Sequence, residues 1–266
     1  MEPLHGNLAV GTTPRARTPE YAKMFFLGLR NAVLRLRRAA VVMQAFIDES
    51  GTHRGAARVS VAAVLGANWQ WKKFLSHWGN KKFHAKEPRC IPLKHGLFEA
   101  IQFSEIECFA AWIDPLVYAR HATPHFKTGL GNPYALCTFA CAVGVCQYCR
   151  ANNLGKVAFT IENGQPNLDF VRETLEYMGS KDRYGISSVS VASKNDFAEL
   201  YPADFLAHSR TSSEDWYQAL LGTGRIWEDC ITAEKVARMS KQMSEGLKKM
   251  RHERQKLKAA TIAAKS

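Results

Sequence analysis

Two adjacent carboxylates follow a short apolar segment in the first quarter of the chain. Asp48 and Glu49 belong to residues 43–51 (MQAFIDESG). In this segment Met43, Ala45 and Ile47 alternate with Gln44, Phe46 and Asp48, and a Ser-Gly turn follows. The alternation predicts a β-strand that ends in acids. Because burying a carboxylate against a sheet is costly without a cation or a proton, these acids either form part of a site or simply end the strand in water.

Two further acids stand at the ends of predicted elements. Glu162 follows residues 156–161 (KVAFTI), which have the pattern of a strand. Asp204 lies among apolar residues in 202–209 (PADFLAHS), which have the pattern of a helix. An Asp on an apolar helical turn needs a cap or a cation, so Asp204 is a stronger site candidate than an ordinary surface acid.

The periodicity predicts five strands and the helices between them. The first strand begins at Met43, and the other four cover 58–66, 106–113, 156–161 and 186–192. The helices cover 68–78, 97–103, 133–150, a segment after Asn167, and 202–209. Apart from the two helices between the second and third strands, the order is β-β-β-α-β-α-β-α, the ribonuclease H-like one. We therefore predict an α/β fold with a five-stranded mixed sheet and helices on both faces.

In that order the first and fourth strands are neighbours at the centre of the sheet. Asp48, Glu162 and Asp204 would then converge at one edge, although they could also be unrelated surface acids. Converging carboxylates form an oxygen-rich, anionic pocket, which suits Mg²⁺ or Mn²⁺. The sequence thus predicts a divalent metal site.

The chain also resembles the bacterial and phage family called domain of unknown function 3800. The resemblance covers residues 43–221 and rests on FIDESG at 46–51, KFHAKE at 82–87, TIENG at 160–164, and the SKN...LYPADFLAH stretch at 193–208. It implies a ribonuclease H-like fold with acidic residues suggestive of a metal-dependent nuclease. The resemblance supports the fold and the site more than the reaction.

The resemblance adds His84 and Glu87 to the candidate site. His84 is open to three interpretations: a metal ligand, a base for the attacking water, or a packed histidine. The ribonuclease H plan takes an acid from its first long helix, but residues 133–150 contain none. The fourth carboxylate is therefore predicted to be Glu49 or Glu87, unless a second metal binds only with substrate. Lys194 could meet a phosphate, neutralise a carboxylate or remain solvated.

The predicted function is a metal-dependent phosphodiester hydrolase or transferase acting on nucleic acid. Asp48, Glu162 and Asp204, with Glu49, would hold ions that activate water and stabilise the leaving oxygen. The alternative is a catalytically degenerate metal-binding or nucleic-acid-binding effector subunit of a phage or mobile-element system. The sequence does not distinguish DNA, RNA and nucleotide substrates.

The positive charge of the chain lies at its two ends. The formal net charge is +12, from 36 basic and 24 acidic residues; residues 1–42 contribute +5 and residues 233–266 contribute +7, which leaves 19 of each sign between them. We predict a basic extension at 1–42, disordered or helical, and a basic helical tail at 222–266. Both tails would attract nucleic acid, and the C-terminal helix would either dock on the core or form a homodimer through its apolar seam.

Seven cysteines are present, four of them in the helix predicted at 133–150. Thiols that spread around one helix cannot surround an ion, so we interpret Cys137, Cys141, Cys146 and Cys149 as buried small hydrophobic residues. An odd cysteine count, without a visible secretory signal or an apolar run of membrane-spanning length, predicts a cytoplasmic protein.

Overall fold

The computed structural model describes residues 42–242 and 245, apart from 54, 131, 166, 182, 183, 213 and 214. These residues belong to one compact unit, Val41–Ser266. Residues 1–41, nearly all of the predicted N-terminal extension, and residues 246–266 of the predicted tail lie outside the described part. The fold can therefore be compared with the sequence over the predicted ribonuclease H-like domain.

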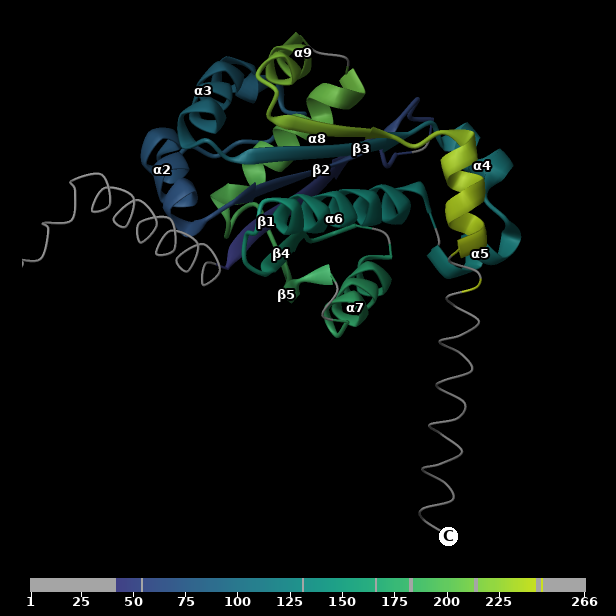
Figure 1. The fold of residues 1–266 in the computed structure, drawn as a ribbon. Helices are drawn as coiled ribbons and strands as arrows, with labels where there is room; N and C mark the ends of the chain where they lie inside the picture. Colours follow the sequence, from purple (N-terminus) through teal and green to yellow (C-terminus); the bar gives the residue numbers. More distant parts are fainter. Residues whose placement is uncertain are drawn as a thin grey trace, which may run out of the picture. The chain divides into compact units, whose positions relative to one another are not determined.

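A mixed β-sheet forms the centre of this unit (Figure 1). Its order is β5-β4-β1-β2-β3-β6. β1 to β3 form an antiparallel meander, while β4 pairs in parallel with β1, and β5 with β4. The predicted adjacency of the first and fourth strands is confirmed. The strands are β1 (Met43–Ser50), β2 (Val59–Gly66), β3 (Glu107–Ile113), β4 (Val157–Glu162), β5 (Ile186–Ala192) and β6 (Ile226–Cys230).

The predicted number of five strands is wrong, because β6 adds a sixth at the edge, parallel to β3. Its sequence, IWEDC, falls within the segment 222–266 predicted as a helical tail, since Glu228 and Asp229 interrupt the apolar pattern of a strand. An edge strand faces solvent and tolerates such residues. The sheet consequently extends beyond residue 221, where the predicted domain ended.

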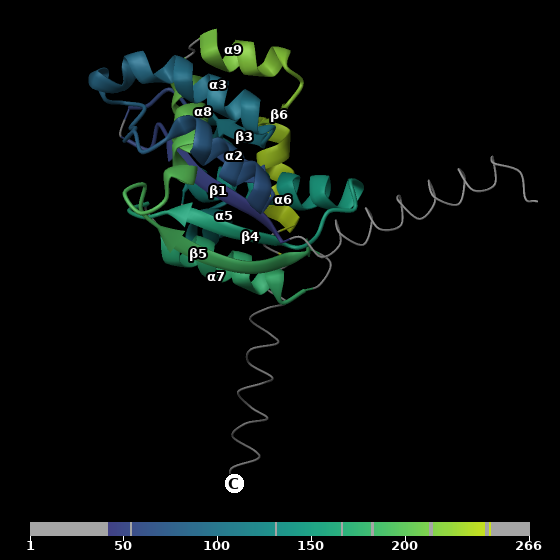
Figure 2. The same cartoon turned by 90° about the vertical axis from the view of Figure 1, so that its left-hand side faces the viewer.

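Helices cover both faces of the sheet (Figures 1 and 2). One face packs against α2 (Asn68–Trp78), α3 (Lys94–Ser104) and α8 (Tyr201–Ser212), and the other against α6 (Pro133–Ala151) and α7 (Leu168–Gly179). β1 serves both cores, because Phe46 belongs to the α8 side whereas Ala45 and Ile47 belong to the α6 side. By this alternation Asp48 faces α8. The remaining elements are η1 (Pro88–Leu93), α4 (Pro115–His121), α5 (Pro124–Leu130), η3 (Ala198–Leu200), α9 (Asp215–Gly222) and helical residues 233–242.

The start of the C-terminal helix docks on its own core. Ile231 and Val236 are buried on the α6 side, and Met239 packs against them. These residues belong to the apolar seam for which docking or dimerisation was predicted, so this part of the seam is already used within the chain. The rest of the seam, Met243, Leu247 and Met250, lies outside the described residues. Among the described residues, no helix is both long and apolar enough to cross a bilayer.

All seven cysteines lie in the described part of the chain, all are free, and only Cys230 is exposed. Two of the thiols on α6, those of Cys137 and Cys141, face the carbonyl groups of Val59 and Val61 in β2. Burial raises the pKa of the Cys149 thiol to about 12, so its reactive thiolate is rare at neutral pH. These thiols therefore pack as hydrophobic groups.

This burial predicts the result of thiol labelling. A maleimide reagent should modify one thiol per native chain, Cys230, and all seven only after denaturation. Mass spectrometry of the labelled protein measures both numbers, with Cys230→Ser as the control that should remain unlabelled. Rapid labelling of two or more thiols in the native protein would contradict the buried positions.

Candidate metal centre

The parallel pairing of β1 with β4 brings two acids to the same edge of the sheet. Ile47 lies opposite Ile161, so the next residues, Asp48 and Glu162, are neighbours at the carboxyl ends of these strands. β1 ends in a turn at Gly51, which has φ +76° and whose hypothetical Cβ would lie 1.9 Å from the carbonyl oxygen of Arg58. Only glycine fits this close approach, and it fixes the end of the acid-bearing strand.

Asp204 reaches the same edge from the first turn of α8, which packs across β1 and β2. Its side chain is 1% exposed. One carboxylate oxygen, Oδ2, accepts a hydrogen bond of 2.8 Å from the backbone N–H of Ala85. The irregular segment that carries the KFHAKE motif therefore contacts the site through its backbone. His84 is the neighbouring residue, and its Nδ1 lies 3.6 Å from the same Asp204 oxygen, while its side chain is 43% exposed.

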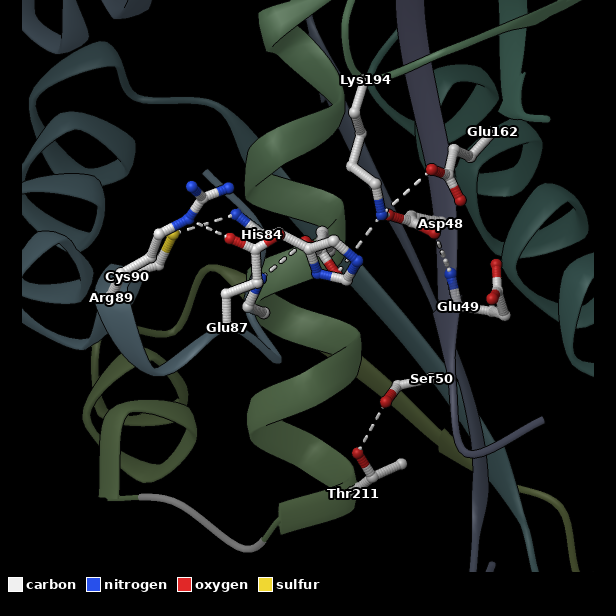
Figure 3. A network of polar contacts seen from close by, with 12 residues as sticks. Asp48, Glu49, Ser50, His84, Glu87, Arg89, Cys90, Glu162, Lys194 and Thr211 are labelled. Atoms are coloured by element: carbon white, nitrogen blue, oxygen red, sulfur yellow. Dashed lines mark hydrogen bonds and ion pairs between the residues drawn. The ribbon is translucent and has the colours of Figure 1, made fainter. Parts of the chain in front are cut away.

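Lys194 points toward Asp48 and Glu162 (Figure 3), and it also reaches Asp204. Its Nζ lies 2.8 Å from an oxygen of Asp48, 3.1 Å from one of Glu162 and 3.6 Å from one of Asp204. Burial opposes the charge of Lys194, but Asp48 and Asp204 outweigh it and raise the pKa above its usual value. Lys194 was predicted to contact a phosphate, to neutralise a carboxylate or to remain solvated. In the structure it neutralises carboxylates.

Glu49 also lies close to these acids. Neighbouring side chains on a strand normally point to opposite faces of the sheet, so its closeness to Asp48 is not expected from the strand alone. One oxygen each from Asp48, Glu49 and Glu162 lie within 4.8 Å of one another. Glu49 is 7% exposed, and its Oε2 has no hydrogen-bond partner among the described residues. Burial raises the pKa of Glu49; burial, and then the charge of Asp204, raise that of Asp48.

Glu87, the other candidate for the fourth carboxylate, is directed elsewhere. Its side chain pairs with Arg89 and is 37% exposed. Figure 3 shows Glu87 beside Arg89 and away from Asp48. The structure thus brings Glu49, rather than Glu87, next to Asp48.

Tyr134 is a residue of this region that the sequence analysis missed. It stands in the first turn of α6, and Asn132 caps that helix by accepting the N–H of Ala135. Burial, and then the charge of Glu49, raise the pKa of the Tyr134 hydroxyl. The signal in the sequence was the absence of an acid from this helix, which directs attention to its first polar side chain.

The donors present fit a hard divalent cation. Asp48, Glu49 and Glu162 bring three carboxylates within 4.8 Å of one another, and Lys194 supplies one positive charge that Asp204 shares. Carboxylate oxygens are the preferred ligands of Mg²⁺ and Mn²⁺, and the buried Glu49 Oε2 lacks any other partner among the described residues. We find both the ligand type and an unused ligand atom at this edge.

Comparison with solved structures finds ribonucleases H. Ribonuclease HII from Archaeoglobus fulgidus, in its complex with PCNA, is 14% identical, with 69% of this chain and 78% of that chain covered and a TM-score of 0.41. Bst-RNase HIII in complex with Mn²⁺ is 16% identical, with 71% and 58% covered and a TM-score of 0.44. Ribonuclease H2 from Pyrococcus horikoshii OT3 is 11% identical, with 69% and 77% covered and a TM-score of 0.38.

The strand order, with helices on both faces of the sheet, is the ribonuclease H-like arrangement expected from the sequence, extended by a sixth strand. No protein-family model and no curated protein matches the chain. The resemblance to the domain of unknown function 3800 family therefore has no support from a family match.

The raised pKa values of Asp48 and Glu49 predict how stability depends on pH without metal. The folded state binds these protons more tightly than the unfolded state, whose carboxyl pKa is about 4. Their contribution to the free energy of unfolding is therefore full below about pH 4 and is lost as the pH rises through the folded-state values. Chelator-treated wild type should lose stability relative to Glu49→Gln over this range, as measured by urea unfolding at each pH. A constant difference between the two proteins would contradict the prediction.

Proposed function

We propose that this chain is a metal-dependent phosphodiester hydrolase or transferase of the ribonuclease H-like type that acts on nucleic acid. One observation carries the proposal: the buried Glu49 carboxylate, with an oxygen that has no partner among the described residues, stands beside Asp48 and Glu162 at the carboxyl ends of two central strands. A surplus of buried negative charge at such an edge favours a bound divalent cation. The related proposal of membership in the domain of unknown function 3800 family depends on the quoted motifs alone.

Each residue of the site has a proposed part in the chemistry. Asp48, Glu49 and Glu162 would hold Mg²⁺ or Mn²⁺, which would supply Lewis acidity and lower the pKa of a water. Asp204 holds Lys194 and the Ala85 amide in place. His84, half exposed beside Asp204, is suited to accept a proton from the attacking water or give one to the leaving oxygen.

The experiment that tests this function is a cleavage screen over single- and double-stranded DNA, RNA and RNA–DNA hybrids. Cleavage should require Mg²⁺ or Mn²⁺ and should be lost in Asp48→Asn. Asp169→Asn is the matched control, because it makes the same change in an 88% exposed side chain on α7. A nuclease activity that Asp48→Asn retains would show contamination or a different site.

A degenerate effector subunit is the second candidate function, and the position of Lys194 favours it. Its ammonium already contacts Asp48, Glu162 and Asp204, so the acids are partly neutralised without metal. Such a subunit of a phage or mobile-element system would bind nucleic acid equally well with a chelator present. Binding that survives chelation, together with no cleavage of any substrate in the screen, would favour this alternative.

Nucleic acid is the proposed partner, attracted through the basic tails, and seven free cysteines fit the proposed cytoplasmic location. Residues 246–266 contain seven Lys or Arg and one Glu, a net charge of +6. Its basic residues are better targets for substitution than those around Val236, because Val236 is part of the core.

We predict that replacing Lys248, Lys249, Arg251 and Arg254 by Gln weakens nucleic-acid binding and flattens its salt dependence. Each lost phosphate contact should reduce the slope of log K against log salt by about 0.9 for duplex DNA. Fluorescence anisotropy over a salt series measures the slope, and turnover at saturating substrate should stay within about twofold of wild type because the site is untouched. An unchanged slope would remove this tail from the interface.

A further inference from the structure

The ammonium of Lys194 lies between three of the four acids predicted as metal ligands. Asp48 Oδ2, Glu162 Oε1 and Asp204 Oδ1 all face Nζ, at 2.8, 3.1 and 3.6 Å. The Lys194 side chain is 15% exposed and the two aspartates at most 1%. Three carboxylates therefore surround a partly buried cation, and that cation is the ammonium group of Lys194.

The remaining oxygens of the aspartates already have partners. Asp204 Oδ2 accepts the N–H of Ala85 at 2.8 Å, and Asp48 Oδ1 accepts the N–H of Glu49 at 2.7 Å. Both aspartates therefore have a partner within the chain for each oxygen, and what separates them is their distance from the other acids. Asp204 does not belong to the group of close carboxylates, which within the described residues comprises Asp48, Glu49 and Glu162.

Glu49 is in the opposite situation. Its Oε2 is buried and has no hydrogen-bond partner among the described residues, and the nearby Glu162 adds to the negative charge around it. The Lys194 ammonium neutralises one of the four acids, and the charge of Lys86 lowers the pKa of Glu49 less than that of Lys194 does. The unmet demand for positive charge therefore lies on the Glu49 side of Asp48, away from the Asp204 side where Lys194 is held.

We propose that this site takes one divalent cation, on Asp48, Glu49 and Glu162, and that Lys194 replaces a second one between Asp48, Glu162 and Asp204. The proposal rests on the proposed function for its metal, but concerns the number of ions rather than the reaction. Lys194 is then a positioning residue, which holds three carboxylates in place and limits the site to one ion.

The experiment counts ions in the full-length protein. Isothermal titration with Mn²⁺, checked by the electron paramagnetic resonance signal of free Mn²⁺, should give one ion per wild-type chain. Lys194→Met removes the ammonium and should give two, with the first ion bound about tenfold more tightly or better because cation repulsion is gone. Lys194→Arg, which keeps the charge, should still give one, and Glu49→Gln should weaken the single ion. Two ions in wild type, or one in a folded Lys194→Met, would overturn the proposal.

Two further outcomes separate this inference from the proposed function. One bound ion without cleavage of any nucleic acid would contradict the function and leave the stoichiometry standing. Metal-dependent cleavage with two ions bound would support the function and contradict the proposed stoichiometry. If Lys194→Met does not fold, the anomalous scattering of Mn²⁺ in wild-type crystals decides: one peak near Glu49 supports the proposal, and a second peak beside a displaced Lys194 overturns it.

Discussion

Replacing Asp48 by Asn is expected to abolish most of the stabilisation that Mg²⁺ or Mn²⁺ gives to this protein. A ligand present at about 100 times its dissociation constant adds about 2.7 kcal/mol to the free energy of unfolding. For a domain of this size that raises the melting temperature by about 5–10 °C. Asp48 contacts Lys194, and one of its oxygens lies within 4.8 Å of oxygens of Glu49 and Glu162. An amide in place of its carboxylate would therefore weaken the centre of the metal site.

The same variant should lower metal-dependent cleavage at least about 100-fold, since even partners of metal ligands cost 10–100-fold when they are removed. Thermal unfolding with Mn²⁺ and with chelator measures the first effect, and the cleavage assay the second. Asp169→Asn should keep the metal-induced shift. Equal shifts in wild type and Asp48→Asn would show that these acids do not form the metal site.

The central strands could be predicted from the sequence because their pattern is strong. β1, β2 and β4 bury at least one face completely, so their apolar residues recur with the period of a strand. β6 could not be predicted in this way. It is a five-residue edge strand whose place in the sheet depends on pairing with β3, a partner more than 100 residues earlier in the chain.

The acids of the candidate site could be predicted from the sequence, but the groups with which they form ion pairs and hydrogen bonds could not. Acids at the ends of β1 and β4 and in an apolar turn of α8 are exceptions to local patterns, so Asp48, Glu162 and Asp204 can be found by reading the sequence. Periodicity assigns a face to each residue but no partner. The contact of Lys194 with Asp48 spans 146 positions, and that of Asp204 with the Ala85 amide spans 119. Such contacts are determined by tertiary packing.

Removing the ammonium at the centre of the site should destabilise the fold more than replacing any one of the acids around it. In Lys194→Met, the carboxylates of Asp48 and Asp204 would remain buried without a cation. Breaking a buried pair in this way costs about 3–5 kcal/mol, because the remaining charge is neither solvated nor paired. Urea unfolding with chelator at pH 7 measures the loss. It should shrink toward pH 4–5, at which the buried carboxyl groups bind protons and need no cation.

The double variant Asp48→Asn/Lys194→Met tests whether the loss arises from this pair. If the uncompensated charge of Asp48 causes it, removing that charge as well should recover about 0.5–3 kcal/mol relative to the sum of the single changes. Lys235→Met is the matched control: Lys235 pairs with Asp229 at a site where both side chains are more than a third exposed, so its loss should cost less than about 1 kcal/mol. Strictly additive single effects, or equal losses at Lys194 and Lys235, would mean that the ammonium does not stabilise the acids. The surplus of negative charge would then have to be relieved by protons, and the case for a cation at Glu49 would weaken with it.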